Sequence, residues 1–229
     1  MNLTIADIKP NKQKAIALLK REVAVFVCDA VQLEGINITL PEVQTLLEGI
    51  TVGGHKLSDQ EITLNQSKSW AQLISDIEKS TFEITAEYAK KLHGLAGKNE
   101  ALEWGCFRSG MVTIAGTDYM PPKPQKLAPL FDAMVEQLGD LNDIYDRAIN
   151  CFLMMARNQF FFDVNKRMGR FMMNGILLDA GYPAINVPVK RQLEFNTLML
   201  EYYEFGNSKN MNAFLRSCLN QKYLQVMSE

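Results

Sequence analysis

Apolar residues recur every three or four positions along most of this chain, which is the spacing of one face of an α-helix. The first clear segment carries this pattern on Leu19, Val23, Phe26, Val27 and Ala30. β-Branched valines also alternate within the segment, as they do in strands, but the length of the pattern favours a helix. We therefore predict a long helix after a lysine-bearing lead-in that ends at Asn11.

Signals at helix ends place the next two helices. Pro41 suits a first helical turn, where its missing N–H would be unpaired anyway, so we expect a short helix over 41–49. Ser58 and Glu61 have the spacing of a capping box, in which each side chain satisfies a main-chain amide of the other residue. A further helix should therefore begin at this box and extend toward Glu78.

More helical patterns follow, and one stretch between them is different. The helical patterns occupy about 84–93, 127–138, 143–157, 165–180, 190–205 and 209–224. The stretch from Val112 to Tyr119 instead alternates apolar with small or polar residues around a glycine. Prolines follow it, and proline cannot donate a ladder hydrogen bond, so they would end a strand. The chain is therefore predicted to be all-α with one small β-hairpin.

Composition narrows the class of protein. Of the 229 residues, 47% are hydrophobic and 22% are charged, which is typical of a folded globular chain. The formal net charge of −2 is the wrong sign for a surface that binds the phosphate backbone of nucleic acid, so nucleic acid is not expected as a main partner. The chain has no uncharged apolar stretch of roughly 18 residues, so we expect no membrane segment and a cytoplasmic location.

Cysteine and histidine are sparse and scattered. The four cysteines are Cys28, Cys106, Cys151 and Cys218. None belongs to a CxxC pair, so we predict buried free thiols. His55 and His93 are too isolated for a zinc site, which needs Cys or His ligands close together in the sequence. Any metal would therefore have oxygen ligands.

The segment 158–170 carries the densest group of reactive side chains, at the start of a predicted helix. A helix N-terminus has free main-chain N–H groups and the positive end of the helix dipole, so it can bind phosphate. Arg167 and Arg170, three residues apart, could donate paired hydrogen bonds to nucleotide phosphates. Asp163 offers an oxygen ligand for Mg²⁺, and Asn165 offers a contact to a further phosphate oxygen. An ordinary Asp N-cap followed by a solvated charged turn is the alternative.

Residues 159–170, QFFFDVNKRMGR, resemble the signature HxFx(D/E)GNGRxxR of the Fic/Doc family. The resemblance extends from about residue 38 to 188 and implies a helical bundle with one β-hairpin. It also implies transfer of AMP from ATP to a Ser, Thr or Tyr hydroxyl of a target protein. The implied ligand of Mg²⁺ is Asp163, the implied holders of the α- and β-phosphates are Asn165 and Arg167, and the implied clamp on the γ-phosphate is Arg170.

Three positions depart from the family pattern. Gln159 stands where the family has histidine, and an amide cannot take a proton from a hydroxyl, so transfer should be weakened. Val164 and Lys166 replace glycines, and Lys166 resembles the lysine of the Doc branch, which looks like a phosphoryl transferrer. The candidate catalytic positions are Gln159, Asp163, Asn165 and Arg167, and the candidate nucleotide-binding residues are Val164, Asn165, Lys166, Arg167 and Arg170.

Two further segments resemble family elements. Residues 45–49 are similar to the inhibitory motif (S/T)xxxE(G/N), which implies that Glu48 pairs with Arg170 and blocks placement of the γ-phosphate. The stretch 112–124 is similar to the family's flap, and a loop of the target protein could pair with its exposed edge by strand addition. The edge residues would be Val112, Thr113 and Ile114.

The resemblance completes the expected organisation. Residues 1–80 would form an N-terminal helical region that contains the candidate inhibitory helix 41–49, and 81–229 would form the Fic core, together one compact unit. ATP and Mg²⁺ are the implied ligands and a target protein is the implied partner, while a homo-oligomer is left open. Three hypotheses follow: a weakened AMP transferase, a Doc-like protein phosphotransferase, and an inactive pseudoenzyme that binds a nucleotide or a partner.

Overall fold

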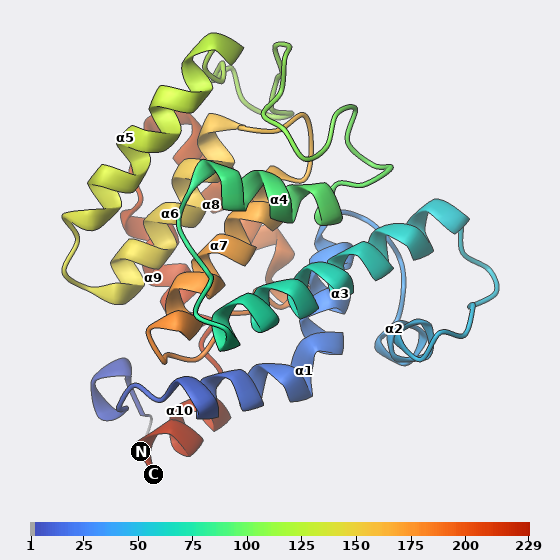
Figure 1. The fold of residues 1–229 in the computed structure, drawn as a ribbon, viewed down its shortest axis with the longest axis vertical. Coiled ribbons are helices and arrows are strands. Elements are labelled where there is room, and N and C mark those ends of the chain that lie inside the picture. Colours follow the sequence, from blue (N-terminus) through green and yellow to red (C-terminus); the bar gives the residue numbers. More distant parts are fainter. Residues whose placement is uncertain (1–2) are drawn as a thin grey trace.

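The computed structural model describes residues 3–229, and in this range the regular structure is entirely helical (Figure 1). The α-helices are α1 (Lys12–Leu33), α2 (Leu40–Leu47), α3 (Leu57–Glu78), α4 (Ala86–Ala96), α5 (Leu127–Gly139), α6 (Ile144–Asn158), α7 (Asn165–Asp179), α8 (Gln192–Phe205), α9 (Lys209–Ser217) and α10 (Gln221–Ser228). Short 3₁₀ turns are η1 (Ile5–Asp7), η2 (Pro124–Lys126) and η3 (Val189–Arg191). The all-α prediction is confirmed for the described residues.

The first helices form where local signals place them. The Asn11 side chain accepts a hydrogen bond of 3.0 Å from the Lys14 N–H and so caps α1. Leu19, Phe26 and Val27 of α1 are buried, so helix rather than strand is confirmed for this segment. A hydrophobic face packed on the core explains why the β-branched residues do not divert the chain into a strand.

Helices α2 and α3 differ in how they begin. Thr39 and Glu42 form a capping box at the start of α2, where the Thr39 N–H donates to the Glu42 carboxylate at 2.7 Å. The capping box predicted at Ser58 and Glu61 is wrong, because α3 begins at Leu57 and Ser58 already lies within it. Glu61 instead accepts a hydrogen bond of 2.6 Å from the side chain of Asn99.

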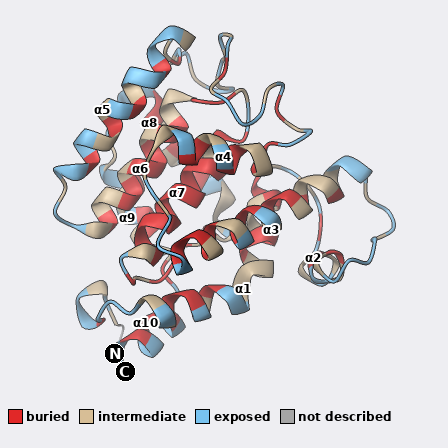
Figure 2. Cartoon of the chain, in the orientation of Figure 1, coloured by how far each residue is buried: buried red, intermediate tan, exposed pale blue. Residues whose placement is uncertain are grey.

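The core is centred on α6 and α7, which lie antiparallel in the middle of the bundle (Figure 1) and are largely buried (Figure 2). Helices α1 and α3 pack directly against α7, so the N-terminal helices and the central pair share one hydrophobic core. Gly169 permits the close approach of α7 to α6, because a Cβ there would lie 2.8 Å from the carbonyl oxygen of Phe152. The predicted boundary between residues 80 and 81 stays a prediction.

The predicted β-hairpin is wrong. Residues 111–120 form a loop with a turn at 115–116, and no strand occurs anywhere in residues 3–229. No main-chain hydrogen bond joins the two arms of this loop. The loop is pinned to α8 instead, because the Thr117 hydroxyl donates to the Glu204 carboxylate at 2.7 Å and Gly116 lies against Leu200. The described contacts of this loop are therefore with neighbouring helices and not between two strands.

The C-terminal segment also departs from the prediction. The single helix expected over 209–224 is two helices, α9 and α10, because Asn220 interrupts it and caps α10 by accepting from the Lys222 N–H at 3.0 Å. Helix α10 packs against α1, and the side chain of Gln221 donates to the Leu3 carbonyl at 3.2 Å. The two ends of the chain therefore lie side by side (Figure 1).

The cysteines are free thiols, as predicted, but they are not all buried. Cys28 and Cys151 are buried, Cys218 is half-buried and Cys106 is exposed. Cys106 is exposed because it lies in the irregular segment after α4, outside the helical core. No helix among residues 3–229 is both long enough and apolar enough to span a membrane.

The contact at Gly169 gives a test of the central packing. Gly169→Ala should destabilise the protein by roughly 1–3 kcal/mol, because the added methyl group meets the main chain of α6, which cannot rotate away. Gly139→Ala is the matched control, since no atom lies within 4 Å of a Cβ at that position. Urea denaturation of both variants checks this, and equal midpoints for the two would contradict the close packing.

Candidate functional site

The turn between α6 and α7 is held in an uncommon backbone conformation. Gln159, which ends α6, has φ of 49°, and Val164, which precedes α7, has φ of 66°. The side chain of Asn165 braces the turn from inside, because it accepts from the Phe161 N–H at 2.9 Å and donates to the Phe161 carbonyl at 2.8 Å. The same amide donates to the side-chain oxygen of Gln159 at 3.0 Å. Asn165, predicted to hold a phosphate oxygen, thus has its amide engaged within the turn.

Two of the three phenylalanines that lead into the turn belong to the core. Phe160 and Phe161 are fully buried, and Phe161 stacks on the ring of His93 with centroids 3.9 Å apart. Nδ1 of His93 accepts from the Gly105 N–H at 3.2 Å. Burial lowers the pKa of His93 to about 4, so this histidine is neutral at pH 7. It supports the turn from behind and is not a substitute for the missing motif histidine.

A cavity of about 430 Å³ lies at the N-terminus of α7. The motif side chains on its wall are Gln159, Asp163, Asn165 and Lys166, those of the 111–120 loop are Thr113, Ile114 and Ala115, and those of α8 are Asn196, Leu200 and Tyr203. Glu34, at the end of α1, completes the wall. The volume is in the range of small-molecule sites in proteins. Segments far apart in the sequence therefore meet where a phosphate-binding helix end was predicted.

Main-chain geometry agrees with a helix end that can receive an anion. The first intrahelical hydrogen bond of α7 runs from the Met168 N–H to the Val164 carbonyl at 2.8 Å. The amides of residues 165–167 precede this bond and so have no partner within the helix. The Asp163 carboxylate accepts from the Val164 N–H at 2.6 Å through one oxygen, which leaves its other oxygen for a ligand.

Arg167 has a carboxylate partner that the sequence did not suggest. Its guanidinium is 3% exposed and donates through both terminal nitrogens to the two carboxylate oxygens of Glu100, one of them at 2.9 Å. Burial lowers the pKa of Arg167, but the hydrogen bonds and charge of Glu100 outweigh burial and raise it. Arg167 does not line the 430 Å³ cavity, so its predicted contact with the nucleotide would require this pair to open or rearrange.

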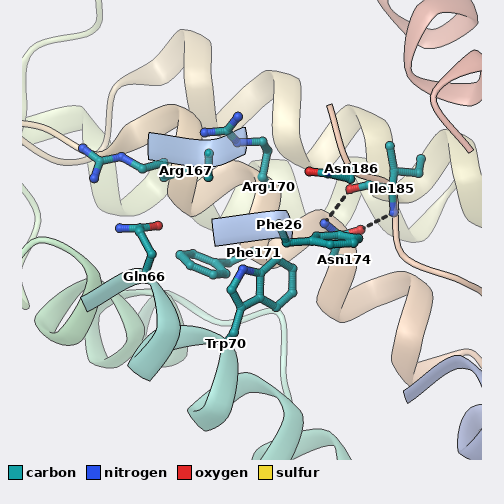
Figure 3. Close-up of a pocket in the computed structure, with 10 residues that line it drawn as sticks. Phe26, Gln66, Trp70, Arg167, Arg170, Phe171, Asn174, Ile185 and Asn186 are labelled. Carbon is teal, nitrogen blue, oxygen red and sulfur yellow. Dashed lines mark hydrogen bonds between the residues drawn. The ribbon is translucent and has the colours of Figure 1, made fainter. Parts of the chain in front are cut away.

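Arg170 is also buried. Figure 3 shows Arg167 and Arg170 together on the wall of a narrow pocket that Trp70 and Gln66 also line. Arg170 lies 3.5 Å from the Glu34 carboxylate, and burial lowers its pKa to about 10 although Glu34 opposes this change. The two arginines thus line one narrow pocket but not the 430 Å³ cavity, and each faces a different glutamate, so their predicted contact with one polyphosphate stays a prediction.

The predicted pair of Glu48 and Arg170 is wrong. Glu48 is exposed at the end of α2, and the carboxylate that faces Arg170 is that of Glu34. Glu34 also lies 3.3 Å from the Lys166 ammonium. Burial acts to raise the pKa of Glu34, but the charges of Lys166, Arg167 and Arg170 outweigh it, and the pKa lies below its ordinary value. The Glu34 carboxylate on the cavity wall is therefore charged at pH 7.

A signal for Glu34 was present in the sequence. Glu34 and Gly35 end α1 with the same Glu-Gly pair that drew attention to residues 48 and 49, and Gly35 has φ of 86°. The Ser/Thr position of the inhibitory motif, four residues earlier, holds Ala30. The same position before Glu48 holds Gln44, so the motif matches neither helix end in full and the local pattern did not distinguish them. Glu100, by contrast, has no local signal, because its pairing is entirely tertiary.

The predicted flap residues reach the same cavity. Thr113 and Ile114 line it, whereas Val112 is half-buried and does not. Their proposed contact with a target protein stays a prediction.

The donor set fits Mg²⁺ bound together with a nucleotide better than a metal held by protein alone. No group of three or more His, Cys, Asp or Glu side chains in the described chain could hold a metal ion. Asp163 is nevertheless exposed to the cavity with one carboxylate oxygen unused. Mg²⁺ commonly uses one or two carboxylates and completes its shell with phosphates and water.

Comparison with known families agrees with the motif. Residues 83–177 match the sequence model of the Fic/DOC family. Residues 83–177 therefore form a Fic/DOC domain. The matched range contains α4 to α6, the 111–120 loop and nearly all of α7, and so includes every motif residue from Gln159 to Arg170. Glu34 lies outside the matched range.

Curated relatives carry one name. The chain is 25% identical over 194 residues to the protein adenylyltransferase Fic of Drosophila grimshawi, which covers 82% of this chain. It is 24% identical over 194 residues to the protein of the same name from Drosophila erecta, again over 82% of this chain. The chain spans only 38% of the length of either relative.

Solved structures support the fold. Fic-1 of C. elegans, residues 134–508, superimposes with a TM-score of 0.79 at 19% identity, over 91% of this chain and 64% of that one. A Fic domain containing signaling protein from Bacteroides thetaiotaomicron gives a TM-score of 0.76 at 18% identity, over 96% of this chain and 90% of that one. These likenesses confirm the Fic-type helical bundle over most of the chain.

Val164 gives a test of the strained turn. A non-glycine residue in the left-handed region costs about 1–2 kcal/mol, so Val164→Gly should be at least about 1 kcal/mol more stable than Val164→Ala. Both changes remove the same buried side chain almost completely, so their difference isolates the backbone. At the exposed position Ala213 of α9, Ala213→Gly should instead destabilise by about 1 kcal/mol. If denaturant unfolding shows that Val164→Ala is more stable than Val164→Gly, backbone strain at this position is excluded.

Proposed function

We propose that this chain is a Fic-type AMP transferase of reduced activity that binds ATP with Mg²⁺ in the cavity at the start of α7. The observation that carries this proposal is the convergence of Gln159, Asp163, Lys166 and the loop residues Thr113 and Ile114 on that one cavity. The Fic/DOC match over residues 83–177 and the shared name of the curated relatives support the chemistry. Because the chain spans only 38% of the length of those relatives, their activity is a proposal for this protein.

In the proposed reaction, the groups around the cavity have separate roles. An oxygen of the target hydroxyl would attack the α-phosphorus of ATP, the bond to the β-phosphate would break, and pyrophosphate would leave. The free amides of α7 and the Lys166 ammonium would hold the negatively charged phosphates in place. Mg²⁺, held through Asp163, would neutralise charge on the phosphates. The hydroxyl proton must go to a base.

Gln159 does not supply that base. Its side-chain N–H donates to the Ala156 carbonyl at 2.6 Å, and its side-chain oxygen accepts from Asn165 at 3.0 Å. An amide has no proton-accepting nitrogen at neutral pH, so the loss of imidazole removes roughly 10²–10⁴ in rate. This observation favours a second candidate function, a pseudoenzyme that retains nucleotide binding and acts through a partner.

Glu34 would add autoinhibition to either function. Its carboxylate faces Lys166 at 3.3 Å and Arg170 at 3.5 Å, so it competes with a γ-phosphate for both cations. Like charges repel across a few ångströms in a partly buried site, so ATP would enter fully only after Glu34 moves away. A cytoplasmic location and a target protein remain predictions, and a homo-oligomer stays open.

Restoring the base and removing the carboxylate together should reveal the chemistry. With ATP labelled on the α-phosphate, Gln159→His combined with Glu34→Gly should label protein in a cell lysate at least about 10²-fold faster than the unaltered chain. Gln159→His alone should give less, because Glu34 still opposes the phosphates. Gln159→His combined with Glu48→Gly is the control and should equal Gln159→His alone, since Glu48 is exposed outside the site.

The outcome separates the hypotheses. No α-phosphate label with the double variant would exclude a site that lacks only its base. Label from the γ-phosphate, but not from the α-phosphate, would favour the Doc-like phosphotransferase suggested by Lys166. Equal stimulation by Glu48→Gly and Glu34→Gly would contradict the role given to Glu34.

Nucleotide binding can be measured without turnover. Calorimetry of the unaltered chain with ATP and Mg²⁺ should detect binding, and Lys166→Ala should weaken it at least about tenfold, because hydrogen bonds to charged groups are worth about 1.5–3 kcal/mol. Lys222→Ala, an exposed lysine of α10, should leave the affinity unchanged. Absence of binding would exclude both the transferase and the nucleotide-binding pseudoenzyme.

A further inference from the structure

Arg108 is a buried arginine without a carboxylate partner. It lies in the irregular segment after α4 and is only 2% exposed. No ion pair of the described residues includes it. A buried cation with no counter-ion is costly unless its N–H groups are all directed at acceptors. The identity of these acceptors therefore shows what Arg108 does.

All three guanidinium nitrogens donate to main-chain carbonyl oxygens. Nε donates to Gln159 at 2.6 Å, Nη1 donates to Gly110 at 2.6 Å, and Nη2 donates to Pro122. The Arg108 N–H also donates to the Phe160 carbonyl at 3.0 Å. One planar side chain thus joins the two ends of the 111–120 loop to the turn that begins α7.

The loop depends on this side chain because it has no ladder of its own. Gly110 and Pro122 flank the loop, and their carbonyls are brought together by the guanidinium in the absence of any main-chain hydrogen bond between the arms. A rigid fork with several donors can hold three oxygens at fixed directions, whereas a lysine ammonium on a flexible stem cannot. The segment thus keeps a hairpin-like course without strands.

The third carbonyl connects the loop to the site. Gln159 adopts φ of 49°, and the bond from Arg108 fixes the orientation of its peptide group, and with it the direction of its side chain. Thr113 and Ile114, on the loop closed by the same guanidinium, line the same cavity as Gln159. The separation between the loop edge and the side chain at position 159 is thus set through Arg108.

We propose that Arg108 is a positioning residue that holds the 111–120 loop and the side chain at position 159 in register across the cavity. Arg108 does not contact the cavity and is not a catalytic residue. If the 111–120 loop presents the hydroxyl of the target protein to the site, a displacement of that hydroxyl by about 1 Å can lower the rate on the order of 10²-fold. The consequence for activity rests on the proposed function, whereas the coupling of loop and turn does not.

The coupling can be tested on the chain without nucleotide. Arg108→Lys should raise thermolysin cleavage within 111–120 and also speed hydrogen exchange at the Phe161 amide by tenfold or more, since the latter is buried within the turn. Arg157→Lys is the matched control. Arg157 stacks on Tyr119 at 4.1 Å and donates to Tyr203 of α8 at 3.1 Å, so its loss should loosen the loop but leave the turn unchanged.

Activity supplies a readout that a merely structural role would not move. In the variant that carries Gln159→His and Glu34→Gly, Arg108→Lys should lower kcat for protein labelling by about 10²-fold and change the calorimetric affinity for ATP less than threefold. Arg108→Gln is the second variant if Arg108→Lys fails to fold. If the parent variant labels nothing, the proposed function fails while the exchange test still decides the coupling.

Three results would overturn the inference. The first is a loop that loosens while exchange in the turn stays unchanged. The second is loss of protection throughout α1, α3 and α7 in both Arg108 variants, which would assign Arg108 to general stability. The third is a parent variant that labels protein and keeps its kcat after Arg108→Lys.

Discussion

The structure depends on the pairing of two buried guanidinium groups at the start of α7. Arg167 is 3% exposed and Arg170 is 8% exposed, and a cation removed from water needs a carboxylate or several hydrogen-bond acceptors nearby. Glu100, from the segment after α4, pairs with Arg167, and Glu34, from the end of α1, pairs with Arg170. These two pairs tie two separate parts of the chain to one helix end, the start of α7. Lys166 lines the 430 Å³ cavity, whereas neither arginine lines it.

The turn before α7 has a related conflict between stability and site geometry. Val164 occupies a backbone region that disfavours β-branched residues, and it persists because its side chain is buried and Asn165 braces the turn. Gln159 fills the position of a proton acceptor with an amide that is hydrogen-bonded at both ends. The turn thus presents a helix end with free amides, while the side chain at position 159 offers no group that could accept a proton. This combination is the reason for proposing that transfer is weakened while nucleotide binding is retained.

Much of the fold was predictable because its signals are local. Local signals extend over only one or two helical turns, so helices can be predicted from them. Examples are the apolar faces of α1, α5, α6 and α7 and the proline at the start of α2. The errors have a common cause. The 112–119 stretch alternates like a strand, yet its contacts are with α8, and Ser58 has capping-box spacing although α3 starts before it. In both cases a tertiary contact or a neighbouring residue outweighed a correct local pattern.

By itself, the sequence determined the helical class and the placement of Asp163, Asn165 and Lys166 at a helix N-terminus, because spacing and helix-end chemistry are properties of neighbouring residues. The tertiary structure decided that Glu34 and not Glu48 faces Arg170, that Glu100 binds Arg167, and that Arg108 closes the loop. Two Glu-Gly pairs of similar appearance end two consecutive helices, and only the packing of α1 against α7 brings one of them to the buried cations. Which charges meet depends on how helices pack, and that information is distributed over the whole core.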